Sequence, residues 1–139
     1  MLVKKEQFPK VVLNEMNDIH STEIDILNQL YEALKDYQQQ KTSQEDVSKL
    51  LEEFLKDVRE HFAFEQGLME EYQFFAYPMH RAEHDRVLME LLELKKEWEK
   101  EKNPNTLLDY LENQFVPWIV NHVQTMDTVT AMYLSNFLK

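Results

Sequence analysis

The amino-acid sequence predicts an all-α protein, an up-and-down antiparallel bundle of four helices. The 139 residues include only one glycine and four prolines, too few for the many turns of an all-β fold. In four separate segments, hydrophobic residues recur at three- and four-residue steps, the spacing of one face of an α-helix. Short connections join these segments, and short connections place consecutive helices antiparallel.

The first helix is expected at about 17–38, after an N-terminal arm of residues 1–16. Its inward face consists of His20, Ile24, Leu27, Leu34 and either Leu30 or Tyr31. The second helix is expected at about 43–73, because Thr42 followed three residues later by Glu45 is typical of a capping box at a helix N-terminus. Its inward face consists of Val47, Leu51, Phe54, Val58, His61, Glu65, Leu68 and Tyr72.

The third helix is expected at about 78–101, where Pro78 suits the first helical turn. Its inward face consists of His80, His84, Val87, Leu91, Leu94 and Trp98. The fourth helix is expected at about 105–123, after the turn signal KNPN. Its inward face consists of Leu108, Leu111, Phe115, Trp118 or Ile119, and His122. With a C-terminal segment at 124–139, residues 1–139 are predicted to form a single domain.

The composition argues against several classes of function. The formal net charge is −11 and the sequence contains no basic patch, which disfavours binding to nucleic acid and to anionic membranes. The apolar runs are too short to cross a bilayer, and the N-terminus does not resemble a signal peptide, so we expect a cytoplasmic protein. The absence of cysteine excludes disulfides and every metal site that depends on thiolate ligands.

All five histidines fall on the predicted inward faces, together with the carboxylate of Glu65. His61 precedes Glu65 by four residues and His80 precedes His84 by four, and such pairs lie about 5–6 Å apart on one helix face. A single buried histidine is usually an ordinary core residue. Histidines from all four helices, with a buried carboxylate that needs partners, favour a transition-metal site instead.

Three other carboxylates lie near these histidines in the sequence. We expect Glu23 and Asp25 to be solvated or to form hydrogen bonds with a ligand rather than to bind metal. Asp127 follows His122 by five residues, a net rotation of about 140° on a regular helix. Both residues can bind the same centre only if the helix ends or widens between them, and Pro117 already removes one backbone bond nearby.

The complete pattern resembles that of the hemerythrin family, in particular the single-domain bacterial hemerythrins. All seven metal-ligand positions of that family are matched in order and residue type, and the similarity covers nearly the whole chain. Neighbouring motifs match too, among them HF at 61–62, LM at 68–69, HRAEH at 80–84 and WIVNH at 118–122. The matching ligand positions are His20, His61, Glu65, His80, His84, His122 and Asp127.

The resemblance implies a hemerythrin-like bundle that holds two Fe ions. One iron would be bound by the three histidines of the third and fourth helices, and the other by His20 and His61. Glu65 and Asp127 would each bridge the two irons, with an oxo or hydroxo bridge as the third link. The iron with two histidines then keeps one open position, and in the family O2 binds there reversibly. Candidate residues lining the O2 pocket are Phe62, Trp118 and Ile119, which would otherwise be ordinary core residues.

The sequence also departs from the family pattern. The N-terminal arm usually carries a tryptophan, whereas this arm has Phe8. Before the first histidine, Asn17 occupies a position that is commonly acidic, which predicts altered hydrogen bonding to His20. Neither change removes a ligand.

The implied function is reversible O2 binding for storage, delivery or detoxification, without enzymatic activity. One alternative is a sensor of oxygen, iron or redox state, which would signal through a separate protein partner. Another is a di-iron enzyme that acts on peroxide or nitric oxide. A third is a structural bundle that binds zinc. We expect O2 itself to be the main binding partner.

Overall fold

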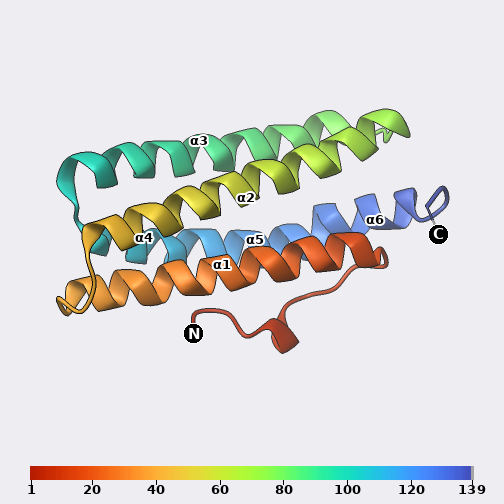
Figure 1. The fold of residues 1–139 in the computed structure, drawn as a ribbon. Helices are drawn as coiled ribbons and strands as arrows, with labels where there is room; N and C mark the ends of the chain where they lie inside the picture. The colour runs from red at the N-terminus through yellow and green to blue at the C-terminus, as the bar shows by residue number, and fades with distance from the viewer. Residues whose placement is uncertain (139) are drawn as a thin grey trace.

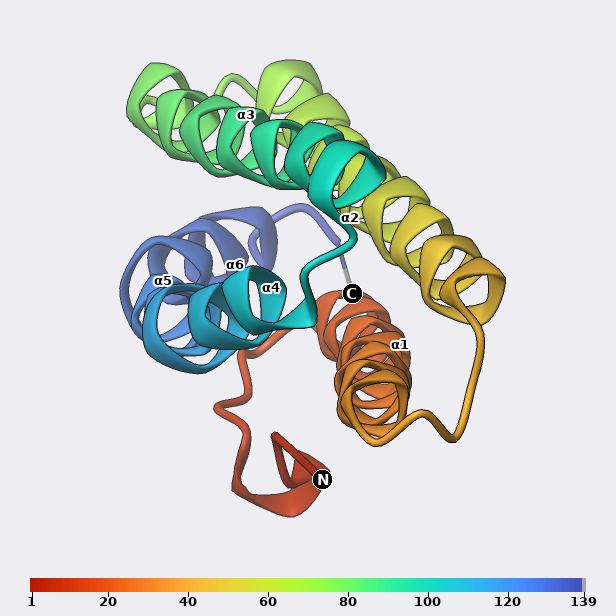
Figure 2. The same ribbon diagram turned by 90° about the vertical axis from the view of Figure 1, so that its left-hand side faces the viewer.

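The structure, a computed structural model, describes residues 1–138, and the regular secondary structure in that part of the chain is helical. Four long helical rods lie side by side and alternate in direction, which confirms the predicted antiparallel four-helix bundle (Figure 1). Seen end-on, the rods surround one interior (Figure 2). No helix among the described residues is long and apolar enough to cross a membrane. The rods are α1 (Asn14–Gln38), α2 (Gln44–Glu71), α3 (Tyr77–Glu101) and a fourth made of α4 (Pro104–Tyr110), α5 (Val116–His122) and α6 (Thr128–Leu134).

Side-chain caps begin α2 and α4, and the cap of α2 corrects the sequence prediction. Ser43, not Thr42, is the N-cap of α2: its hydroxyl accepts a hydrogen bond from the backbone N–H of Asp46 at 3.3 Å. The predicted motif was therefore one residue out of register, because two adjacent hydroxyl residues offer the same capping chemistry. At α4, Asn103 accepts from the N–H of Asn105, and Pro104 occupies the first helical turn as its missing N–H allows.

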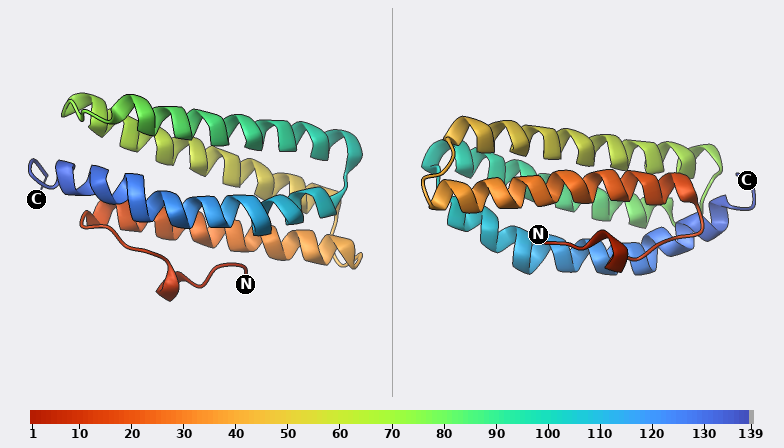
Figure 3. Two further views of the ribbon diagram at one scale, coloured as in Figure 1. Left: turned by 180° about the vertical axis from the view of Figure 1, so that it is seen from behind. Right: turned by 60° about the horizontal axis from the view of Figure 1, so that its bottom comes forward.

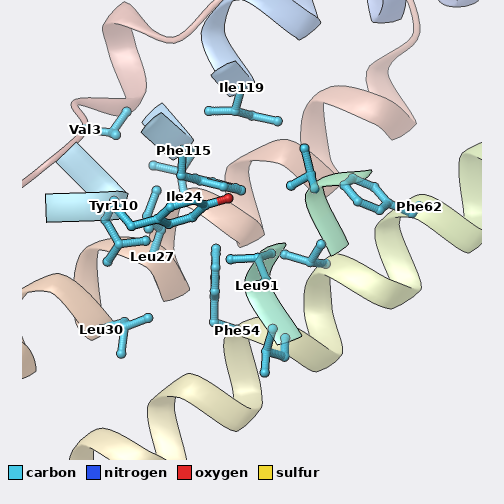
Figure 4. Packing of buried hydrophobic residues seen from close by; sticks show 14 of the residues in the cluster. Val3, Ile24, Leu27, Leu30, Phe54, Phe62, Leu91, Tyr110, Phe115 and Ile119 are labelled. Carbon is cyan, nitrogen blue, oxygen red and sulfur yellow. The ribbon is translucent and has the colours of Figure 1, made fainter. Parts of the chain in front are cut away.

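The hydrophobic core lies along the faces that the periodicity predicts (Figure 4). Of the paired alternatives, Leu30 and Ile119 are buried, whereas Tyr31 and Trp118 are only half-buried. Towards the end of α2 the buried position is Met69, and the predicted Leu68 is half-buried. An α-helix has 3.6 residues per turn, so positions spaced at a strict seven-residue repeat rotate slowly around the helix. Along a helix as long as α2, the buried position therefore shifts by one residue near the end.

The fourth rod continues well past its predicted end at about 123. Two wide, π-helical turns interrupt it at Leu111–Phe115 and Val123–Asp127, but α6 carries it on to Leu134. Thr130, Ala131 and Leu134 are buried in the bundle, and this burial stabilises a helix within the C-terminal segment 124–139, which the prediction had placed after the end of the fourth helix.

The N-terminal arm, residues 1–13, runs back along α1 on the outside of the bundle (Figure 3). Two side-chain amides tether it through paired hydrogen bonds to its backbone. Asn17 accepts from the N–H of Val11 and donates to its carbonyl, at 2.9 and 2.8 Å, and Asn28 does the same with Val3 at 2.9 and 2.8 Å. A side-chain amide carries its donor and its acceptor on separate atoms, which lets asparagine at position 17 bond to both the N–H and the carbonyl of Val11.

The arm tether leads to a test. We expect Asn17→Asp to remove the bond to the Val11 carbonyl and to place a carboxylate against that oxygen, weakening the tether by about 1–3 kcal/mol. Amide hydrogen exchange should then become faster in residues 1–13 and remain unchanged in α2 and α3. Asn14→Asp, which adds the same charge at an exposed position of α1, is the control. Equal exchange rates in both variants would contradict the tether.

Candidate metal centre

Side-chain donors from all four rods converge at one place in the bundle interior. They form two groups, and within each group one donor atom per residue lies within 4.8 Å of all the others. Every member is at most 2% exposed. The three-histidine group consists of His80, His84, His122, Glu65 and Asp127. The two-histidine group consists of His20, His61, Glu65 and Asp127. The structure therefore brings together all seven residues that the sequence singled out.

Glu65 belongs to both groups because its two oxygens face opposite ways. Its Oε2 lies 2.7 Å from His61 Nε2 and 3.5 Å from His20 Nε2. Its Oε1 lies 3.4 Å from His84 Nε2 and 3.6 Å from His80 Nε2. One carboxylate thus supplies one oxygen to each half of the centre.

Asp127 divides its oxygens in the same way. Its Oδ2 lies 3.2 Å from His20 Nε2, in the two-histidine group. Its Oδ1 lies 3.0 Å from His80 Nε2 and 3.2 Å from His122 Nε2, in the three-histidine group. The centre is therefore built around two carboxylates that each span both halves.

The wide turn at Val123–Asp127 makes this position of Asp127 possible. At its end the backbone N–H of Thr128 bonds to the carbonyl of Val123, five residues back, and the Thr128 hydroxyl bonds to the same oxygen at 2.7 Å. The extra residue in the turn brings Asp127 onto the face of His122. Of the two alternatives that the sequence left open, the helix widens rather than ends.

The donor set is incomplete without a cation. Glu65 Oε1, both oxygens of Asp127 and both ring nitrogens of His20 are buried and have no hydrogen-bond partner. Leaving ionised carboxylates buried and unpaired costs several kcal/mol, so a positive charge is required between them. Imidazole nitrogens and carboxylate oxygens are also the donors that iron, zinc and related ions accept. The residues therefore fit a pair of transition-metal ions.

The electrostatics of the interior agree with this fit. Burial lowers the pKa of His20, but the carboxylates of Asp127 and Glu65, whose oxygens lie 3.2 and 3.5 Å from its Nε2, outweigh burial and raise that pKa to about 9. Burial also opposes charge on His61, yet Glu65 and Glu23 hold its pKa well above the usual value. For Glu65, burial is outweighed by the neighbouring histidines, which keep its pKa well below the ordinary range. The site favours ionised carboxylates and attracts positive charge.

Outer contacts fix three of the histidine rings. His61 Nδ1 lies 2.8 Å from Glu23 Oε2, His80 Nδ1 lies 2.8 Å from the Thr130 hydroxyl, and His84 Nδ1 lies 3.3 Å from the Gln66 amide. Neither Thr130 nor Gln66 was expected from the sequence to contact the centre. Thr130 lies in the segment that was not expected to be helical, and its spacing of three residues from Asp127 was the available signal.

The residues around His20 are arranged differently. Its Nδ1 has no hydrogen-bond partner, because Asn17 is engaged with the N-terminal arm. Phe8 covers the ring in an edge-on contact with centroids 6.0 Å apart. Asp25 is exposed and pairs with Lys5 at 2.9 Å, so it takes no part in the centre.

Of the three predicted lining residues, Phe62 and Trp118 contact histidines of the centre. The ring of Phe62 stacks on His84 with centroids 3.9 Å apart and also lies 5.2 Å from His61. Trp118 stacks on His122 at 4.5 Å, and Ile119 is part of the buried core (Figure 4). Phe62 therefore contacts both halves, whereas Trp118 lies against the three-histidine half.

The fold and the donors define a helical-bundle protein with a buried metal centre made of histidines and carboxylates. Residues 11–134 match the family model described as the hemerythrin HHE cation binding domain. The chain belongs to the hemerythrin family.

Individual proteins of this family are similar to the chain over most of its length. The chain is 40% identical over 136 residues to a bacteriohemerythrin of Aquifex aeolicus (strain VF5), covering 98% of this chain and 100% of that protein. It is 27% identical over 123 residues to a bacteriohemerythrin of Methylococcus capsulatus (strain ATCC 33009 / NCIMB 11132 / Bath), covering 86% of each. A crystal structure of wild-type hemerythrin superposes with a TM-score of 0.78 at 23% identity, covering 97% of this chain and 98% of that one. That structure supports the fold.

The raised pKa values predict how metal binding depends on pH. At neutral pH in the metal-free protein, His20 and His61 hold protons that a metal ion must displace. Metal affinity should therefore rise with pH, about tenfold per unit for each displaced proton, and should level off for His20 above about 9. His84 adds no proton, because burial lowers its pKa.

Calorimetric titration with Zn²⁺ in two buffers of different ionisation enthalpy measures the released protons directly. The expected result is net proton release at pH 7 that decreases towards pH 9. The same proton count at both pH values would show that His20 is not the group displaced.

Proposed function

We propose that this protein binds O2 reversibly at a di-iron centre held by the seven converging residues, for oxygen storage, delivery or detoxification. One observation carries the proposal: two donor groups with unequal numbers of histidines share the same two carboxylates. Family membership supports it. When bound, two iron ions supply an open coordination position and the electrons that reversible O2 binding needs.

The unequal histidine count determines where that position lies. Three histidines, one oxygen from each of two carboxylates and one bridging oxygen would complete six ligands on one side. His20 and His61 with the other oxygen of each carboxylate and the same bridging oxygen would give five on the other side. The open position would therefore belong to the two-histidine half, next to His20 and His61.

The types of donor favour binding O2 over activating it. Five neutral imidazoles and only two shared carboxylates make a site with little negative charge for two ions. Anionic oxygen donors stabilise the higher oxidation state more than imidazole does, so this set helps the reduced form to return when O2 leaves.

The surrounding side chains shield the donors from solvent. The donors are at most 2% exposed, Phe62 contacts the rings of both His61 and His84, and Phe8 covers His20 from the arm. A dry site suppresses loss of a reactive bound species to solvent. These contacts support carriage of O2 rather than catalysis.

A spectroscopic cycle tests the proposal. Protein loaded with Fe²⁺ without oxygen should develop a visible charge-transfer band on addition of O2 and should lose it when O2 is removed. A band that never forms, or that decays at once to a stable oxidised spectrum, would argue instead for an oxidase, a peroxidase or a redox sensor.

A variant at the two-histidine half gives a second prediction. We expect His61→Ala to retain one iron instead of two, by metal analysis, and to lose the reversible band, because its ring supplies one of only two nitrogens there. Glu60→Ala, a change at the preceding, exposed position of α2, should behave as wild type. Full O2 binding by His61→Ala would overturn the ligand assignment.

A further inference from the structure

A third carboxylate is buried beside the centre without belonging to either donor group. Glu23 of α1 is only 1% exposed, and its Oε1 has no hydrogen-bond partner. Its Oε2 lies 2.8 Å from Nδ1 of His61 on α2, the neighbouring helix. An ionised carboxylate in such a place is costly unless the charges around it compensate.

Glu23 fixes the chemical state of the His61 ring. A carboxylate can only accept, so Nδ1 of His61 carries the proton and donates it to Glu23. The other nitrogen, Nε2, then faces the centre, 2.7 Å from Glu65 Oε2. His61 is therefore held at both ends in the orientation that metal binding through Nε2 requires. When a metal ion displaces the proton from Nε2, the proton that Glu23 holds on Nδ1 leaves the ring in the tautomer that this binding needs.

The charge of Glu23 distinguishes the two halves. In the three-histidine group, the recorded Nδ1 partners are neutral: the Thr130 hydroxyl for His80 and the Gln66 amide for His84. In the two-histidine group, His61 has a carboxylate partner and His20 has none. Among the described residues, the half with fewer nitrogens receives the one negatively charged Nδ1 partner.

We infer that Glu23 is a positioning residue that fixes His61 for metal binding and adds a negative charge to the two-histidine half of the centre. The inference rests on the proposed di-metal site. The carboxylate makes the imidazole a stronger donor, so the ion in that half is bound more tightly. Its charge also favours the more oxidised state of an ion held there, because a nearby negative charge stabilises added positive charge.

Three variants separate positioning from simple packing. Glu23→Ala removes the hydrogen bond and the charge. Glu23→Gln keeps an amide oxygen that can accept from Nδ1 but removes the charge, and it preserves the side-chain size, which protects the fold. Thr130→Val is the matched control, because it removes the neutral partner of His80 in the three-histidine half.

Metal affinity is the first measurement. Competition between the protein and a chelator for Co²⁺ yields the dissociation constants of both ions. In Glu23→Ala we expect one ion to bind about 10–100-fold more weakly, and in Glu23→Gln we expect partial recovery. Nitrogen-15 NMR of the Zn²⁺-loaded protein should show the Nδ1–H resonance of His61 displaced in Glu23→Ala and unaltered in Thr130→Val.

The reduction potential of the iron-loaded protein is the second measurement, which a merely structural role would not move. Glu23→Gln removes a negative charge and should raise the reduction potential. Thr130→Val leaves the charge of the centre unchanged and is the control. Wild-type Co²⁺ affinities in Glu23→Ala, or an unchanged potential in Glu23→Gln, would overturn the inference. A failure of the proposed O2 binding would give a different result. The wild type would lack the reversible band, but the Co²⁺ affinities of the Glu23 variants would still differ from those of the wild type.

Discussion

The burial of two shared carboxylates, Glu65 and Asp127, is the constraint on which the rest of the structure depends. Neither is exposed, and both have oxygens without hydrogen-bond partners, so the interior must supply positive charge. That requirement accounts for a bundle in which every rod directs histidine inward where leucine would pack better. The hydrophobic core occupies the remaining length of the same faces, so one helical periodicity serves both packing and metal binding.

The fourth rod accommodates this constraint by changing its pitch. A regular helix would turn Asp127 away from His122, and the wide turn at Val123–Asp127 corrects the mismatch without ending the helix. A second wide turn at Leu111–Phe115 lies just before Pro117, which cannot donate to the usual carbonyl. The irregular backbone is thus confined to one rod, while α1, α2 and α3 remain regular and give the donors a rigid frame.

The sequence predicted the bundle and its inward faces because periodicity depends only on local spacing. Resemblance to a family, rather than spacing, supplied Asp127, since a regular helix would have left it at the surface. The sequence left open whether Glu23 would be solvated or hydrogen-bonded to a ligand. Its partner, His61, could not be named, because the contact joins residues 38 positions apart on different helices and depends on how α1 and α2 pack. The fourth rod was cut short in the prediction because the turn before α6 breaks the repeat that such reasoning follows.

The N-terminal arm lies over the centre without supplying a metal donor. A change in the arm can therefore affect access to the centre without changing the donors, whereas a change of a donor would affect both. Its amide tethers at Asn17 and Asn28 contact no metal donor, yet Phe8 on the same arm lies over His20 in the two-histidine half. A segment held in this way has its own opening equilibrium, of lower stability than the bundle. For a small molecule that enters past Phe8, the strength of the tethers would set the rates of arrival and departure, while the buried donors would set the equilibrium constant.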